Sequence, residues 1–285
     1  SSIPAPIVDG DRCIFALLAG GPRDPRWKPD VADEAASAME KTARELFGEP
    51  HKIPRRGPYH AETVGVSMGG GQEHPMPFFH TVTHALLMAQ LLAIPAFQRI
   101  AGFTNSIFLS FAPRLHEYYR STMEALYKWD KTLPWIFDLS TSVFAAATFN
   151  FGPRTVTLPH LDFANLAWGW CAITALGNFD PNKGGHLILW DLRLVIRFPP
   201  GCTILIPSAI VRHSNVSIQQ GEQRFSFTQY TAAGIFRFVY NGFRTEKAVK
   251  CSQMTMAEKA KRAEERKRRW VEGLKMYSKW DVAFE

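Results

Sequence analysis

Three residues of the chain have the types and the spacing of an iron site. His160 and Asp162 are separated by one residue, and His213 lies further along the sequence. Two imidazoles and one carboxylate can occupy one face of an octahedral Fe(II) ion, which leaves three positions for substrate, oxygen or water. A His-x-Asp pair by itself is weak evidence, because residue frequencies alone place such pairs in a sizeable minority of chains this long. The hypothesis therefore depends on the elements that carry the three residues.

These residues stand at the ends of predicted strands. His160 and Asp162 follow a predicted strand at residues 154–158, and alternation along an extended chain would send both side chains to one face. His213 follows an apolar strand at 203–206, so a second strand could bring it to the same opening. The pattern predicts that one opening of a β-structure holds all three residues.

An arginine and a serine share a face of the next predicted strand. Arg224 opens this strand and Ser226 follows two residues later. An arginine inside an apolar barrel needs an anionic partner because an unpaired buried charge is costly, and its guanidinium suits bidentate capture of a carboxylate. A dicarboxylate that chelates iron at one end and meets Arg224 at the other would satisfy both requirements. The alternative is a jelly roll in which the His, Asp and Arg residues are incidental.

The elements that would position these residues form an α+β pattern. Many short strands separated by Gly/Pro turns are typical of a sandwich or jelly roll, and here they are predicted at 143–149, 154–158, 170–176, 187–190, 192–198, 203–206, 225–230 and 235–240. Helices are predicted at 31–47, 80–93, 95–102 and 113–130, after an irregular lead-in at 1–29. The predicted fold is a double-stranded β-helix (jelly roll) core buttressed by N-terminal helices, with a C-terminal basic helix. We expect one domain over residues 1–285: lead-in and helical support at 1–139, the core at 140–243 and a basic tail at 244–285.

The basic charge of the chain is concentrated near its C-terminus. The formal net charge is +7, and residues 244–280 hold 12 Lys/Arg against 5 Asp/Glu, a surplus of 12 − 5 = +7. A helix is predicted at 256–280, with an apolar stripe that contains Ala263, Trp270, Leu274 and Tyr277. This helix could dock by its stripe with a solvated basic face, contact nucleic-acid phosphates, or carry a nuclear-targeting signal at 266–269. These interpretations do not exclude one another.

The remaining composition narrows the class of protein. The four cysteines are scattered without a CxxC pair, which argues against a disulfide framework and a structural zinc site and fits a reducing compartment. Residues 1–12 carry charges where the apolar part of a signal peptide would lie, and no apolar run approaches the roughly 20 residues that span a bilayer. We therefore expect no membrane partner. Four other histidines lack HExxH spacing and are predicted to be structural or surface residues: His74, His80, His84 and His116.

Most of residues 65–240 resembles a known family. The motif His160-x-Asp162, His213 and Arg224-x-Ser226 is similar to that of the Fe(II)- and 2-oxoglutarate-dependent dioxygenases. More narrowly, the chain resembles the TET/JBP branch, which modifies nucleic acids, and especially its fungal versions. The segments that carry this resemblance are GVSMGGGQ (65–72), RIAGF (99–103), FNFGPRTVT (149–157), HLDFANLAWGWCAITALGNFD (160–180), GGHLILWDL (184–192) and RFSFTQYTAAG (224–234).

The resemblance implies two cofactors and the residues that bind them. Fe(II) would be bound by His160, Asp162 and His213. The distal carboxylate of 2-oxoglutarate would be held by Arg224 and Ser226. His186 stands where related enzymes place a histidine near that carboxylate, although an ordinary strand residue is the alternative.

The resemblance also implies a pocket for a base. Asn165 matches the residue that reads the polar edge of a flipped cytosine, and a turn-capping asparagine is its alternative. Tyr230 matches the aromatic residue that stacks on the flipped base, and a packed strand tyrosine is its alternative. At Ala232 the chain departs from the family, which often has a base-contacting histidine there, so the identity of the base is left open.

The implied function is oxidation of methylated bases in double-stranded DNA with Fe(II), 2-oxoglutarate and O2. The favoured substrate is 5-methylcytosine, converted to 5-hydroxymethylcytosine and further oxidised forms, after the base is flipped out of the duplex. Outside 244–280 the charges balance, so phosphate binding is expected from that segment and from Arg55 and Arg56. We expect a nuclear monomer. The alternatives are a hydroxylase of N6-methyladenine, RNA, protein or a small molecule on the same scaffold, and a non-catalytic nucleic-acid reader.

Overall fold

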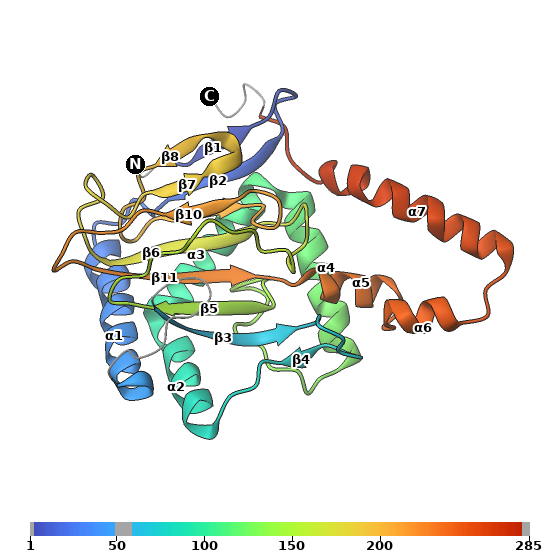
Figure 1. The fold of residues 1–285 in the computed structure, drawn as a ribbon, viewed down its shortest axis with the longest axis horizontal. Coiled ribbons are helices and arrows are strands. Elements are labelled where there is room, and N and C mark those ends of the chain that lie inside the picture. Colours follow the sequence, from blue (N-terminus) through green and yellow to red (C-terminus); the bar gives the residue numbers. More distant parts are fainter. Residues whose placement is uncertain (1–2, 49–58, 281–285) are drawn as a thin grey trace.

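The computed structural model describes residues 3–48 and 59–280 and contains two antiparallel sheets (Figure 1). The large sheet has the order β1-β2-β9-β6-β11-β5-β3-β4, and the small sheet has the order β10-β7-β8. The strands are β1 (Ala5–Val8), β2 (Ile14–Gly20), β3 (His60–Ser67), β4 (Met76–Pro77), β5 (Ala146–Phe151), β6 (Cys171–Asn178), β7 (Leu187–Leu189), β8 (Leu194–Ile196), β9 (Thr203–Ile206), β10 (His213–Asn215) and β11 (Gln223–Tyr230). Neighbours that are distant in sequence, such as β9, β6 and β11, are typical of a jelly roll, and the predicted fold class is confirmed.

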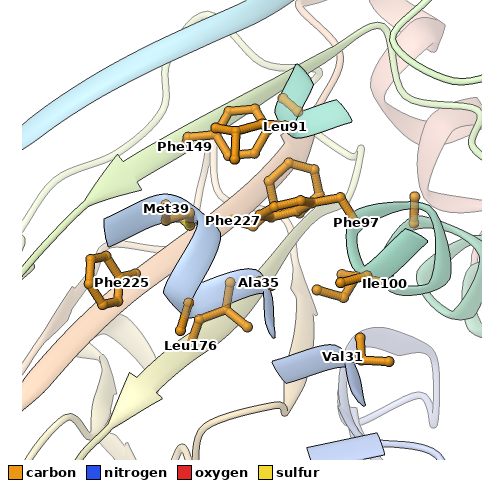
Figure 2. Packing of buried hydrophobic residues seen from close by; sticks show 14 of the residues in the cluster. Val31, Ala35, Met39, Leu91, Phe97, Ile100, Phe149, Leu176, Phe225 and Phe227 are labelled. Carbon is orange, nitrogen blue, oxygen red and sulfur yellow. The ribbon is translucent and has the colours of Figure 1, made fainter. Parts of the chain in front are cut away.

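Helices α1 (Glu34–Phe47), α2 (Val82–Ala93) and α3 (Pro95–Phe111) pack on one face of the large sheet, and α1 continues a π-helical segment at Lys28–Asp33. The other helices are α4 (Pro113–Trp129), α5 (Ala233–Tyr240), α6 (Glu246–Cys251) and α7 (Met256–Leu274). Figure 2 shows side chains of α1 and α3, among them Met39 and Phe97, packed against Phe149 and Phe227 of the sheet. This buried layer fixes the helices on the side of the sheet opposite the cavity described below.

β11 shows how one strand serves both faces of the sheet. Phe225 and Phe227 are buried in the helix-side core, whereas Arg224, Ser226 and Thr228 line a cavity on the other side. Successive side chains of a strand point to opposite faces, so the apolar and polar residues of the RFSFT sequence separate cleanly. The same strand therefore anchors the fold and supplies the site.

The predicted irregular lead-in at 1–29 is wrong, because it contains β1 and β2. β2 pairs with β1 and β9 inside the large sheet, and Ile14 and Leu17 are completely buried. The surrounding Pro and Gly residues are turn signals, but the apolar run Ile14–Gly20 between them is long enough for a strand.

The predicted strand at 235–240 is also wrong, because these residues belong to α5. Ile235, Phe236 and Phe238 are buried, and Phe236 lies against Tyr119 of α4 with ring centroids 4.8 Å apart. A short apolar run does not by itself distinguish a strand from a helix, and here packing against α4 selects the helix.

Several predicted boundaries differ by smaller amounts. The third predicted helix, 95–102, extends to Phe111, and the predicted strand 192–198 shortens to β8 after a 3-10 turn at Trp190–Leu192.

Among the described residues no single helix has the length and apolarity to cross a membrane. Helices α2 and α3 have that length and apolarity only when they are taken together, and they are bent by 65° at their junction.

α7 runs along the outside of the molecule and is joined to β11 through α5 and α6 (Figure 1). A capping box of Thr255 and Glu258 begins the helix, and it ends at Leu274, shorter than the predicted 256–280. The predicted apolar stripe is only partly packed: Tyr277 is 5% exposed, but Trp270 is 42% exposed.

Candidate active site

A cavity of about 390 Å³ lies beside β5 and β11 and is closed by the loop at 157–165 and by β10. Pockets of this size are typical of small-molecule and cofactor sites. All but one of the residues predicted to bind metal, 2-oxoglutarate or base line it: His160, Asp162, Asn165, His213, Arg224, Ser226, Tyr230 and Ala232. Long-range pairing of strands thus brings together residues that span more than sixty positions of sequence.

The predicted triad is assembled at this cavity. The Nε2 atom of His160 lies 3.8 Å from Oδ1 of Asp162, and the Nε2 atom of His213 lies 3.9 Å from Oδ2 of the same carboxylate. One ligand atom from each residue can be chosen so that all three lie within 4.8 Å of one another. Two nitrogen donors and one carboxylate oxygen on one side of a shared space fit the facial arrangement of non-heme Fe(II).

The two histidines are held by the backbone rather than by the predicted strand at 154–158, which the structure does not contain. His160 N donates to His213 O at 3.1 Å, and His213 N donates to His160 O at 3.0 Å. Asp162 N donates to Ser208 O at 2.9 Å. These bonds place the loop that carries His160 and Asp162 beside β10, so both histidines and the carboxylate share one opening.

The rings of both histidines are oriented for metal binding. The Nδ1 atom of His160 lies 2.8 Å from Leu158 O, and the Nδ1 atom of His213 lies 2.9 Å from Val211 O. A carbonyl oxygen can only accept a hydrogen bond, so each Nδ1 carries the proton. The neutral ring then presents the lone pair of Nε2 to a metal, which is the usual role of such a carbonyl partner.

Arg224 is a buried cation at the same cavity. Its side chain is 3% exposed, and its Nη1 donates to Thr155 Oγ1 at 3.0 Å and to Thr155 O at 3.3 Å. Burial lowers the pKa of this guanidinium to about 10, so it is still charged at neutral pH. Within residues 3–48 and 59–280, its Nε has no hydrogen-bond partner and it forms no ion pair. A buried charge with an orphaned donor fits an anionic ligand, and the distal carboxylate of 2-oxoglutarate has the required chemistry.

Ser226 lies beside Arg224 on the cavity face of β11. Its Oγ accepts a hydrogen bond from Asn150 Nδ2 at 3.0 Å, which leaves the hydroxyl proton for an acceptor. Tyr59 lines the same cavity. Its electrostatic effect raises the pKa of Arg224, but burial lowers that pKa by more. Sequence reasoning missed Asn150 and Tyr59, because neither belongs to a recognisable motif.

His186 is the one predicted site residue that the structure does not bring to the cavity. Its neighbour Leu187 lines the cavity and begins β7, whereas His186 is absent from the described residues of the lining. Alternate residues of an extended chain point in opposite directions, so Leu187 and His186 cannot both face the cavity. His186 is instead held by its backbone, with Val216 N donating to His186 O at 2.9 Å.

The residues predicted to contact a base lie at the mouth of the cavity. Asn165 Nδ2 donates to Ser208 Oγ at 3.1 Å, and Asn165 forms an antiparallel bridge with Ala232. Ala233 N donates to Ala164 O at 2.8 Å, which ties this loop to the start of α5 just after β11. Asn165, Tyr230 and Ala232 are therefore close neighbours although they come from two separate segments.

Asn215 is a further residue that sequence reasoning missed. Its Oδ1 accepts from Thr157 N at 2.9 Å and from Thr157 Oγ1 at 2.7 Å, and its Nδ2 donates to Thr155 O at 3.0 Å. The side chain thus replaces the strand ladder that was predicted for residues 154–158. It aligns the segment that contacts Arg224 with the segment that leads to His160.

The chain was compared with known protein families, sequences and solved structures, and only solved structures are similar to it. No family model matches the chain, and no curated protein matches it by sequence. The solved structure of NgTET1 in complex with 5mC DNA is similar over 81% of this chain and 76% of that one, with a TM-score of 0.57 and 14% identity. An oxidoreductase of the 2OG-Fe(II) oxygenase family from Burkholderia pseudomallei matches 70% of this chain and 81% of its own, with a TM-score of 0.37 and 17% identity. OsALKBH1 matches 79% of this chain and 100% of its own, with a TM-score of 0.36 and 10% identity.

The likeness to NgTET1 covers 81% of this chain and shows a shared fold at an identity too low to carry a substrate. What the fold holds in this chain is a His–Asp–His triad next to a buried, unpaired arginine. These residues fit the cofactor pair of an Fe(II)- and 2-oxoglutarate-dependent dioxygenase.

Proposed function

We propose that the chain is an Fe(II)- and 2-oxoglutarate-dependent dioxygenase that oxidises a methylated base in DNA, with 5-methylcytosine as the favoured substrate. The observation that carries the cofactor part is the orphaned Nε of the buried Arg224 in the cavity that also holds the triad. An isolated metal site would not require a buried cation beside it. A dicarboxylate would neutralise Arg224 at one end and could chelate a metal held by the triad at the other.

The roles of the residues follow from their donors. His160, Asp162 and His213 would hold Fe(II), and Arg224 with Ser226 would hold the distal carboxylate of 2-oxoglutarate. When bound, the iron and the 2-oxo acid together supply the power to oxidise a C–H bond with O2. The chain contributes preorganisation: both imidazoles keep their Nδ1 protons on backbone carbonyls and so stay in the ligand tautomer.

The cavity also has room and chemistry for a base. Asn165 presents a carboxamide near the metal site, and Tyr230 presents an aromatic ring on the same wall. Flipping a base out of a duplex costs a few kcal/mol, which edge hydrogen bonds and stacking can offset. The fold match to a protein in complex with 5mC DNA makes methylated DNA the first substrate to test, although an identity of 14% does not by itself fix the substrate.

The test is an assay of purified protein with Fe(II), 2-oxoglutarate, O2 and duplex oligonucleotides that carry 5-methylcytosine, N6-methyladenine or no methyl group. With the 5-methylcytosine duplex only, we expect one succinate for each oxidation step, so that succinate equals 5-hydroxymethylcytosine at early times and exceeds it once further oxidised bases form. The Asp162→Asn variant should give neither product. Succinate without stimulation by DNA would favour a hydroxylase of another substrate. Tight DNA binding with no succinate in the presence of iron would favour a reader.

A further inference from the structure

A second, larger hollow of about 630 Å³ adjoins the active-site cavity. It lies between α7, α5 and the loop at 163–168, and we call it the α7 groove. The active-site cavity and the α7 groove share two wall residues, Phe163 and Asn165. A ligand at the mouth of the active-site cavity would therefore lie next to the α7 groove, and Phe163 would stand at the boundary between the two spaces.

The groove is held open by contacts at both ends of α7. Near its start, Arg262 Nη2 donates to Asn241 Oδ1 at 2.9 Å, and Tyr240 OH donates to Glu265 Oε2 at 2.7 Å. Beyond its end, Tyr277 OH donates to Trp168 O at 2.8 Å. Gly273 is buried against the Trp168 ring, where an added Cβ would lie 2.3 Å from the nearest ring atom. α7 is thus fixed against the body at two places, and its residues between them form one wall of the groove.

The walls of the groove are rich in aromatic rings that remain accessible. Phe163 is 81% exposed and Tyr240 is 49% exposed. Tyr118 and Phe236 stack on each other behind them, with ring centroids 5.0 Å apart. An exposed phenylalanine forgoes apolar burial worth about 2 kcal/mol, which a stacked base would recover. Bases stack on such rings with little sequence preference.

The rim of the groove carries arginines. Arg237, Arg268 and Arg269 line it, against Glu265 and Glu272. Glu265 is already engaged by the Tyr240 hydroxyl, and the Arg269 guanidinium lies over the Tyr240 ring at 4.7 Å from its centroid. A guanidinium stacked on a ring still presents N–H groups at its edge, where they suit a phosphate. Arg268 Nε lies 3.4 Å from Glu264 Oε1, but this pair is exposed and weak, so a phosphate can displace it.

We propose that the α7 groove binds the nucleotides that adjoin the flipped base on the same DNA strand, with their bases against the aromatic wall and their phosphates at Arg268 and Arg269. Phe163 then separates the base in the active-site cavity from its neighbour in the groove. This inference rests on the proposed DNA substrate. It predicts that the enzyme grips an unstacked stretch of one strand rather than a flipped base alone.

The test compares two double variants of α7 that remove the same charge. Arg268→Gln with Arg269→Gln changes the groove, whereas Arg266→Gln with Lys267→Gln changes exposed residues of the helix that do not line it. Binding of a fluorescein-labelled, unmethylated single-stranded oligonucleotide is followed by anisotropy across a salt series, without iron or turnover. We expect the groove variant to bind at least about 10-fold more weakly, with a salt slope smaller by about 1.4 for two lost phosphate contacts. The control variant should bind within about 2-fold of the wild type.

A second measurement locates the bound DNA strand on the protein. An oligonucleotide with 5-iodouracil next to 5-methylcytosine should crosslink on irradiation to Tyr240, Phe163 or Trp168, as read by mass spectrometry of peptides. Equal losses in both double variants, or crosslinks confined to residues outside the groove, would overturn the inference. Because neither readout needs oxidation, a protein that binds in the groove without oxidising the base would refute the proposed function alone. Oxidation with unchanged binding by the groove variant would refute this inference alone.

Discussion

His160 and His213 exchange two backbone hydrogen bonds, N to O at 3.1 Å and at 3.0 Å, and each ring donates its Nδ1 proton to the carbonyl two residues earlier in the chain. The pair is therefore positioned by hydrogen bonds that leave the Nε2 atom of each ring facing Asp162. The donors of these three residues should accordingly decide metal affinity.

The Asp162→Asn variant tests the triad. It removes the single negative charge of the donor set while it keeps the volume of the side chain, so affinity for a divalent metal should fall by more than about 100-fold, beyond the effect of losing an outer-shell contact. Calorimetric titration with Mn(II) measures this without oxidation. His186→Gln is the matched control, because His186 does not line the cavity, and it should bind Mn(II) like the wild type.

The Arg224→Met variant tests the role of the buried guanidinium. Truncating one partner of a buried charge pair costs about 2 kcal/mol or more, so the Kd for 2-oxoglutarate should rise by at least about 30-fold. Without 2-oxoglutarate, the free energy of unfolding should stay equal or increase, since a buried cation with an orphaned Nε is replaced by an apolar side chain. A thermal melt with and without 2-oxoglutarate distinguishes the two effects. A large loss of stability in the free protein would mean that Arg224 is a structural residue.

Asn165→Ala should change the choice of base more than the use of the cofactor. A site that hydrogen-bonds a polar edge loses discrimination when its donor or acceptor is removed, and one such contact to a neutral group is worth about 0.5–1.5 kcal/mol. We expect kcat/KM for the 5-methylcytosine duplex to fall by about 3- to 10-fold, with the KM for 2-oxoglutarate unchanged. Competition between methylated oligonucleotides measures the loss of selectivity. Equal changes in both constants would instead indicate that Asn165 holds the loop through Ser208.

Acid should destabilise the protein in part through His116. This residue is 4% exposed, its Nε2 lies 2.9 Å from Asn105 Oδ1, and burial lowers its pKa below the ordinary 6.5. The unfolded chain therefore takes up a proton first as the pH falls below 6.5, and the free energy of unfolding decreases toward the lowered pKa of the folded state. His116→Gln keeps a donor for Asn105 but does not titrate. Urea melts of both proteins between pH 7.5 and 5, a range chosen to bracket roughly the ordinary histidine pKa, should give a shallower pH dependence for the variant.

Gly65→Ala should damage the sheet beside the cavity. Gly65 has a φ of +100°, and an added Cβ would lie 2.2 Å from Ala145 O. Strain at such a position costs about 1–3 kcal/mol, and the clash with backbone adds to it. Gly70→Ala is the control, because Gly70 also has a positive φ, of +56°, but nothing lies within 4 Å of its added Cβ. Chemical denaturation should show a markedly larger loss for Gly65→Ala, and equal losses would contradict the clash.

Local patterns in the sequence were sufficient for the chemistry and for the fold class. The spacing of His160 and Asp162, and the alternation of Arg224 and Ser226 with Phe225 and Phe227, are properties of neighbouring residues. Such short-range patterns predict which residues face a common side of a strand. The structure places the polar residues of both patterns, and not the phenylalanines, around one cavity. Arg55 and Arg56, which were expected to contribute to phosphate binding, lie outside the described residues.

Long-range contacts decided the rest. The apolar run 235–240 is compatible with a strand or a helix, and only its packing on α4 makes it α5. Asn215 lies far along the sequence from the Thr155–Thr157 segment that it aligns, so no local pattern could reveal the loop that replaces the predicted strand. The sequence alone determined the donors, because donor chemistry belongs to the residue type. Only the tertiary structure decided that His186 does not line the cavity, that the Nε of Arg224 has no hydrogen-bond partner and that α7 opens a groove beside Phe163. Burial and distance exist only once distant segments have packed together.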